Sequence, residues 1–189
     1  IMGVSYENEE NYLSYGSFDN KKNRILKEKN YGQNNLKEVD WVVGCSMLID
    51  RNKIQSSKLF DENIFLYFEE IDFCRQTKIK GGKVFSSSKL IVKHLGHKGS
   101  AATDPNYTIE SEMFRNWHWM WSSFYYHKKH GNFILAFFKI FPKLISSTFK
   151  YLFFLIFFNK KKKIIYLYRL KGIINSIIGK KSWYRPTLD

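Results

Sequence analysis

The stretch LFDENIFLYFEEIDFCRQTKIKGGKVF, residues 59 to 85, contains the signals that decide the fold. Three acids, Glu69, Glu70 and Asp72, follow an aromatic run and precede a pair of glycines at positions 81 and 82. Acids in the first turn suit the positive end of a helix, and glycine commonly ends one. The stretch therefore predicts a helix that begins near Glu69 and ends before the glycine pair.

The segments around this helix predict an α/β arrangement. The run VDWVVGCSMLID, residues 39 to 50, is typical of a buried strand, with small residues in its middle that let backbone or ligand approach closely. Residues 83 to 94 predict two short strands or one interrupted strand. The polar residues 5 to 37 predict loops with at most one short element.

A long helix is predicted over residues 108 to 130. Met113, Trp117, Met120 and Phe124 lie three or four residues apart and form one apolar stripe. The order of strand, helix, strand, loop and helix indicates the second half of an α/β domain.

The net charge of +14 belongs entirely to residues 113 to 189, which contain 15 basic residues and a single acid. Residues 1 to 112 contain 16 basic and 16 acidic residues. This asymmetry indicates a region that binds something anionic, either a membrane surface or nucleic acid. The two cysteines, Cys45 and Cys74, fit neither a disulfide framework nor a zinc knuckle.

The acids at 69, 70 and 72 have two interpretations. Exposed acids at a helix start are the ordinary one. The other is an active site, because a histidine, His94, ends the next apolar run, and strand ends bind ligands in α/β sheets. A carboxylate flanked by carboxylates and apolar side chains has a raised pKa, which suits a general base. A nearby histidine can hold a divalent metal, although a structural histidine is the commoner case.

Several motifs, taken in order, resemble the C-terminal half of family 2 glycosyltransferases, particularly the rhamnosyltransferase-like branch. They are VDWVVGCSMLIDR, the stretch 59 to 85, LIVKHLGHKGS, FRNWHWMW and KKHG, and together they span about residues 38 to 132. The resemblance implies a GT-A fold, a Rossmann-like α/β sandwich. It also implies transfer of a sugar such as rhamnose, with inversion, from a nucleotide-diphosphate donor. The acceptor is then a hydroxyl of a glycan or lipid-linked glycan in cell-surface polysaccharide synthesis.

The resemblance implies roles for single residues as well. Glu70 occupies the position of the catalytic base, which is more often Asp in that family. Glu69 and Asp72 occupy positions of neighbouring acids that contact substrate. His94 matches the histidine associated with a divalent metal, Mn or Mg, and His97 is the second choice for that role. Further substrate contacts are implied at the small-residue strand end and in the loop that follows His94, where a solvated loop is the alternative: Gly44, Cys45, Ser46, Lys98 and Ser100.

The nucleotide-binding half of such enzymes carries a D-x-D motif for the metal, and this sequence contains no D-x-D. We therefore expect residues 1 to 131 to form the acceptor side of a GT-A domain whose nucleotide-binding half is missing. The 189-residue chain is expected to be inactive by itself, and the metal is expected to need the missing half.

Residues 132 to 163 are very apolar, with three lysines on one narrow face of a helix: Lys139, Lys143 and Lys150. This pattern predicts an amphipathic helix, kinked at Pro142, that lies in a membrane interface. The lysines at 160 to 163 suit anionic headgroups. The alternatives are a helix packed on the catalytic domain and a short transmembrane segment.

We accordingly expect residues 132 to 189 to form a basic, apolar helical tail at the cytoplasmic face of a membrane, with another short interfacial helix over residues 172 to 186. The rival function is a basic module that binds membrane or nucleic acid without catalysis. Five aromatic residues are available for stacking on bases: Trp117, Trp119, Trp121, Tyr125 and Tyr126. Nucleic acid is the weaker choice of partner, because Trp117 belongs to the predicted core stripe.

Overall fold

The computed structural model describes residues 1–6, 15–19, 24–27, 36–54, 58–92 and 105–185. The chain is a mixed α/β protein that divides into two compact units. Residues 1–61 and 69–96 form one, called here the α/β unit. Residues 62–68 and 97–189 form the other, called here the helical unit.

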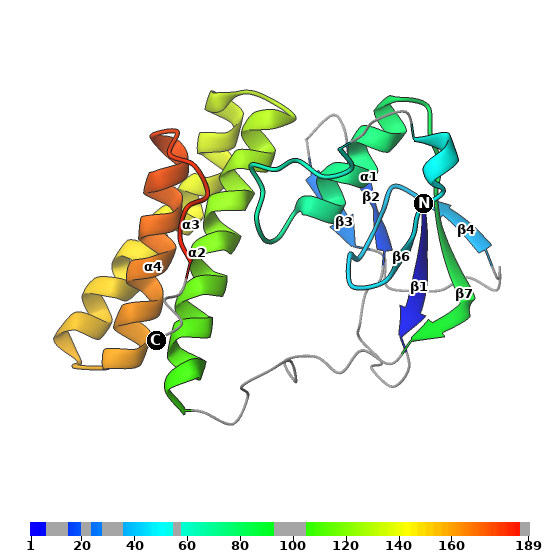
Figure 1. Cartoon of the computed structure of the whole chain (residues 1–189). Coiled ribbons are helices and arrows are strands. Elements are labelled where there is room, and N and C mark those ends of the chain that lie inside the picture. The colour runs from blue at the N-terminus through cyan, green and yellow to red at the C-terminus, as the bar shows by residue number, and fades with distance from the viewer. Residues whose placement is uncertain (7–14, 20–23, 28–35, 55–57, 93–104, 186–189) are drawn as a thin grey trace. The chain divides into compact units, whose positions relative to one another are not determined.

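The α/β unit contains a four-stranded sheet with the order β4-β7-β1-β6. Strand β1 (Met2–Tyr6) is parallel to β7 (Val84–Val92), and the two lie side by side in Figure 1. Strand β4 (Leu36–Val39) is antiparallel to β7, and β6 (Met47–Leu48) is antiparallel to β1. Of the two alternatives predicted for residues 83 to 94, two short strands or one interrupted strand, the described part of this range shows a single strand whose register against β1 shifts once.

A second, three-stranded antiparallel sheet has the order β3-β2-β5. It consists of β2 (Tyr15–Asp19), β3 (Arg24–Lys27) and β5 (Trp41–Val42). The prediction that the region before residue 37 forms loops with at most one short element was therefore wrong. Strands β2, YGSFD, and β3, RILK, are too short to give a sustained apolar alternation that sequence reading detects.

The single buried strand predicted for residues 39 to 50 is in fact divided between the two sheets. The chain leaves the first sheet after Val39 and enters the second at Trp41. Asp40 fixes the crossing point, because its carboxylate accepts the Phe18 N–H at 2.6 Å and pairs with Lys78 Nζ at 2.6 Å. Residues 44 and 45 then turn the chain back into β6.

Helix α1 (Glu69–Ile79) starts and stops where the sequence predicts. Gly81 ends it in the left-handed conformation, with φ of 79°, and the Gly82 N–H donates to the Thr77 carbonyl at 2.9 Å. Its inner side contributes Cys74 to a core built with Val42 and Val84. Because the helix is packed on this side, Glu69 and Glu70, which are both partly buried in its first turn, have a fixed place in the α/β unit.

The helical unit consists of α2 (Pro105–Lys129), α3 (Phe133–Ile156) and α4 (Lys160–Ile177), and Figure 1 shows α3 and α4 against α2. The long helix predicted over residues 108 to 130 is confirmed. Of its apolar stripe, Trp117, Met120 and Phe124 are buried. Met120 and Phe124 share one core with residues of both following helices.

This packing changes the expected division of the chain at residue 131. Because α2 shares a core with α3 and α4, it belongs with them rather than with the sheets. The predicted helix over residues 132 to 163 is two helices, since α3 ends at Ile156 and α4 begins at Lys160. Residues 172 to 177 continue α4 and are partly buried against the bundle, so the short separate helix expected there is not present.

Helix α3 begins at an N-cap, where the Asn132 side chain accepts the Leu135 N–H at 2.8 Å, and it continues through Pro142. Within the part of the chain that the structure describes, no helix combines the length and the apolarity that a bilayer crossing requires.

Candidate active site

The two residues immediately before α1 have an unusual backbone. Tyr67 and Phe68 adopt φ values of 65° and 71°, the left-handed region that bulky side chains avoid. Each such residue costs about 1–3 kcal/mol, and such conformations cluster at functional sites. The aromatic run therefore enters α1 through a strained turn, which places Glu69 and Glu70 in the first turn of the helix.

Gly44 contacts the second of these acids. A Cβ atom added to Gly44 would lie 2.9 Å from the Cβ of Glu70, which is closer than real Cβ contacts. The turn between β5 and β6 therefore passes directly over the Glu70 side chain, and only glycine permits this approach. The structure thus brings together Gly44 and Glu70, two residues that the sequence selected independently. The next two residues of the turn, Cys45 and Ser46, are exposed and half-buried respectively.

Burial is the main electrostatic influence on this pair of acids. The pKa of Glu70 is raised to about 7, first by burial and second by the negative charge of Glu69. The backbone N–H groups of Glu70, Ile71 and Gly44 act in the opposite direction. Burial also raises the pKa of Glu69. The prediction that crowding and apolar surroundings raise the pKa is confirmed, with burial ahead of the neighbouring charge.

One oxygen of each carboxylate is buried without a hydrogen-bond partner in the described part of the chain: Oε2 of Glu69 and Oε2 of Glu70. Buried polar atoms are nearly always paired, so each exception calls for an explanation. A carboxyl group with a pKa near 7 and a free acceptor oxygen can accept a proton from a hydroxyl group.

The third acid, Asp72, occupies a different place. It is buried, and it lies about 200° around the helix from Glu70, at about 100° per residue. It therefore does not share the face that Glu70 presents to Gly44. Cys74, one helical turn beyond Glu70, is also buried, which raises the pKa of its thiol to about 12.

The aromatic residues before α1 pack within the helical unit. The Phe65 ring lies 5.9 Å from that of Phe114, and the Phe68 ring lies 5.3 Å from that of Tyr126. Ser122 Oγ donates to the Leu66 carbonyl at 2.8 Å. The aromatic run therefore anchors residues 65 to 68 to α2. Its composition alone would suit the wall of a sugar pocket equally well.

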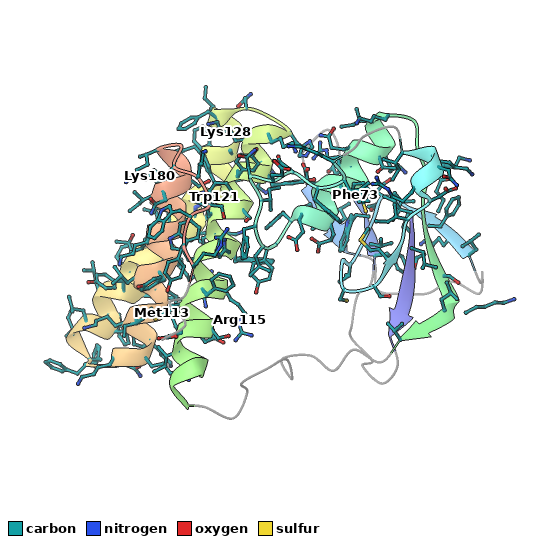
Figure 2. The ribbon with its side chains drawn as sticks, in the orientation of Figure 1. Phe73, Met113, Arg115, Trp121, Lys128 and Lys180 are labelled. Carbon is teal, nitrogen blue, oxygen red and sulfur yellow. The ribbon has the colours of Figure 1, made fainter. Side chains whose placement is uncertain are left out.

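A C-terminal segment after α4, residues 180 to 185, holds the same region of the helical unit and was missed by the sequence reasoning. Trp121 Nε1 donates to the Lys180 carbonyl at 3.0 Å, and these two residues are labelled near each other in Figure 2. The Arg185 guanidinium lies 3.4 Å from the centroid of the Phe65 ring. This segment closes over α2 beside the residues that lead into the acids.

His118 joins this C-terminal segment to α2. Its Nε2 lies 2.8 Å from the Tyr184 carbonyl, and its Nδ1 lies 3.1 Å from Ser182 Oγ. Burial lowers the pKa of His118 to about 4, so the ring is neutral, donates to the carbonyl and accepts from the hydroxyl. A histidine beside Trp117 of the predicted core stripe was the available sequence signal, because a buried ring needs partners for both nitrogens.

Several predicted site residues lie outside the described residues. These are His94, Lys98 and Ser100, together with His97 as the alternative histidine. In the regions that are described, no group of three or more His, Cys, Asp or Glu side chains forms a donor set for a metal ion. A divalent metal with His94 as ligand stays a prediction, and no step below depends on it.

A separate cleft lies elsewhere in the α/β unit. It has a volume of about 780 Å³ and is lined by residues that include Leu48, Ile49, Thr77, Gly82 and Phe85. These residues surround the C-terminal end of α1, whereas the acids are at its N-terminal end. The cleft is therefore distinct from the Glu70 site.

Comparison of the chain with protein families, with curated proteins and with solved structures finds no significant match. The case for function therefore depends on the residues and their geometry.

Proposed function

We propose that the chain carries the acceptor side of an inverting sugar-transfer site, with Glu70 as the general base, in an enzyme that resembles family 2 glycosyltransferases. The observation that carries this proposal is Glu70 itself, with its pKa raised to about 7 and a buried carboxylate oxygen that has no partner in the described structure. A general base works best when its pKa lies near the operating pH.

The reaction follows from this geometry. An acceptor hydroxyl placed at the free oxygen of Glu70 gives its proton to the carboxylate as the hydroxyl oxygen bonds to the anomeric carbon of the donor. The bond from that carbon to the nucleotide diphosphate breaks, and its electron pair leaves on the phosphate oxygen. Attack from the face opposite the leaving group inverts the anomeric carbon. Glu69, whose charge helps to raise the pKa of Glu70, strengthens the base.

The surroundings of Glu70 suit a hydroxyl group of a sugar. Gly44 allows the backbone to pass beside the carboxylate, and Cys45 and Ser46 follow in the same turn as candidate acceptor contacts. The parallel pair β1 and β7, flanked by antiparallel strands, supports a GT-A type of sandwich, as does the order of α1 followed by β7. The resemblance assigns the donor, a nucleotide-diphosphate sugar such as one carrying rhamnose, to a nucleotide-binding half with a D-x-D motif. It assigns the metal to that half together with His94.

The aromatic evidence for nucleic-acid binding is weakened by burial. Trp117, Trp121 and Tyr126 are buried in the helical unit, and Tyr125 stacks on Trp121 with a centroid distance of 5.0 Å. Among the five candidate stacking residues, only Trp119 is exposed. We therefore retain sugar transfer, rather than nucleic-acid binding, as the proposed function.

Two measurements test this proposal. Carboxyl NMR of the 189-residue chain, titrated with a panel of glycans, is expected to show a shift of the Glu70 signal in response to an acceptor. The chain joined to a nucleotide-binding half is expected to transfer sugar from a panel of nucleotide sugars. Glu70→Gln should reduce that transfer at least about 1000-fold, while Glu62→Gln, at an exposed position, should retain it. Full transfer by folded Glu70→Gln would exclude Glu70 as the base.

A further inference from the structure

The outer face of α3 is a continuous exposed apolar surface, called here the α3 face. Ile134 and Phe138 are 67% and 68% exposed, and Phe149 and Ile156 are 69% and 68% exposed. Phe141, Ile145 and Leu152 are exposed between them. At about 100° per residue these side chains fall within an arc of about 120°. No charged residue of α3 falls within that arc.

The lysines of α3 lie on the opposite side of the helix from the α3 face. Ala136, Ile140 and Ser147 are buried in the bundle. Lys143 lies beside this buried face and donates to Ser123 Oγ at 3.2 Å, and Lys150 lies over the Tyr166 ring at 5.4 Å. The lysines therefore follow the side of α3 that meets the other helices, and the α3 face is left purely apolar.

The turn after α3 extends this surface to a tip. Phe157 and Phe158 are 64% and 88% exposed, and Phe158 holds a left-handed φ of 52°. An apolar side chain that is almost fully exposed at a strained turn is not explained by packing within the chain.

Four lysines follow the tip directly and occupy the first turn of α4, residues 160 to 163, which contains no acid. The N-terminus of a helix carries a partial positive charge, so cations there disfavour the helix. The Asn159 side chain caps this end by accepting the Lys162 N–H at 3.0 Å. An anionic partner at that point would offset the unfavourable interaction between these cations and their own helix.

We propose that the α3 face and the tip at Phe157–Phe158 dock into the headgroup region of a bilayer that contains anionic lipid, with α3 lying parallel to the surface. Apolar side chains enter the boundary with the acyl chains, and the lysines of α4 bind the phosphates of the headgroups. Interfacial helices combine these two features, a broad apolar face and a basic border. This inference is independent of sugar transfer.

Charge favours lipid over a second copy of the chain. Residues 113 to 189 contain 15 basic residues and one acid, so two copies joined through their α3 faces would bring like charges together. An anionic surface removes that repulsion. The α3 face also offers no hydrogen-bonding side chain within its arc for a nucleic acid to use.

Sedimentation of the 189-residue chain with vesicles tests the proposal. Vesicles of phosphatidylcholine with about one-third phosphatidylglycerol are expected to bind it. Vesicles of phosphatidylcholine alone are expected to bind it about 600-fold more weakly, at about fivefold for each of the four lysines at residues 160 to 163. Phe138→Ser/Phe149→Ser is expected to weaken binding about 100-fold, near tenfold for each apolar side chain withdrawn from lipid.

A matched pair of variants controls for general loss of apolar surface. Ile134 on α3 and Ile79 on α1 are each 67% exposed. Ile134→Ser is expected to weaken vesicle binding about tenfold, and Ile79→Ser to leave it unchanged. Equal effects of Ile134→Ser and Ile79→Ser would overturn the proposal. Unchanged vesicle binding by Phe138→Ser/Phe149→Ser, with intact helix by circular dichroism, would also overturn it. So would a dimer in solution that only the α3 variants dissociate, or single-stranded RNA that competes with vesicles for the protein at moderate salt.

Discussion

Replacing Glu70 by Gln is expected to stabilise the α/β unit at neutral and alkaline pH while leaving it unchanged near pH 4. Glu70 has a pKa of about 7 in the folded protein, against 4.5 as its ordinary value, and burial is the main cause. At about 1.4 kcal/mol for each pKa unit, the ionised carboxylate lowers the free energy of unfolding by about 3 kcal/mol.

The sign of the pH dependence follows from proton binding. Between pH 4.5 and about 7 the folded state holds a proton on Glu70 that the unfolded state has released. Stability therefore falls as the pH rises through this window, and the full loss is present above it. Gln carries no charge at any pH, so the stability of Glu70→Gln should be flat through the same window with respect to this residue.

Urea unfolding at pH 4, 6 and 8 measures this effect, followed by the methyl NMR signals of Val42 and Val84, which are fully buried in the α/β unit. The difference between Glu70→Gln and the native chain should grow from near zero at pH 4 to about 3 kcal/mol at pH 8. The exposed Glu62→Gln provides the matched control. A Glu70 carboxyl that titrates near 4.5 by NMR, or a constant difference across the three pH values, refutes the reasoning.

Three further predictions concern other parts of the chain. A Cβ on Gly172 would lie 2.3 Å from the backbone oxygen of Trp117, so Gly172→Ala should lower the free energy of unfolding of the helical unit by about 3 kcal/mol or more, measured by urea titration of the circular dichroism. Gly44→Ala should displace Glu70, since the new Cβ would lie 2.9 Å from the Glu70 Cβ, and carboxyl NMR should show the pKa of Glu70 moving away from about 7. His118 has a pKa lowered by burial to about 4, so stability should be full above pH 6.5 and fall as the pH drops from 6.5 towards 4, a loss that His118→Gln should reduce in urea unfolding.

Each of these three has a control or an opposing result. Gly179 has open space around it but a φ of 75°, so Gly179→Ala should cost only about 1 kcal/mol, and an equal effect at Gly172 would contradict the packing argument. An unchanged Glu70 titration in Gly44→Ala would mean that the turn moves freely away from α1. A stability of the helical unit that rises on acidification would contradict a buried, neutral His118.

Patterns that depend on neighbouring residues allowed parts of this structure to be predicted from the sequence. Helix α1 is bounded by acids and by Gly81, and α2 is marked by the stripe that contains Trp117 and Met120. Both signals are local, because they reflect the helical repeat and the chemistry of helix ends. The smaller contribution of Glu69 to the raised pKa of Glu70 was predictable for the same reason, since acids adjacent in sequence stay close in any fold, whereas the larger contribution comes from burial and depends on the tertiary packing.

Features that depend on distant parts of the chain could not be predicted. The crossing between sheets at Asp40 is set by Phe18 and Lys78, which lie far from it in sequence. The contact of Gly44 with Glu70 could be suspected only from their residue types. The closure of residues 182 to 185 over His118 likewise joins segments more than sixty positions apart. Pairings of this kind leave no period in the sequence, because they are selected by the whole fold.

The features around Glu70 all act against stability, and this is the strongest physical reason to regard the region as functional. Tyr67 and Phe68 hold left-handed conformations, and Glu69 and Glu70 each bury an oxygen without a partner in the described structure. Natural chains are otherwise locally consistent, and conflicts between local preference and fold concentrate where a site needs them. An ordinary helix cap would instead expose its acids and relax its backbone. Under the proposed function, a hydroxyl group bound at Glu70 would pair with the free oxygen and offset part of this cost.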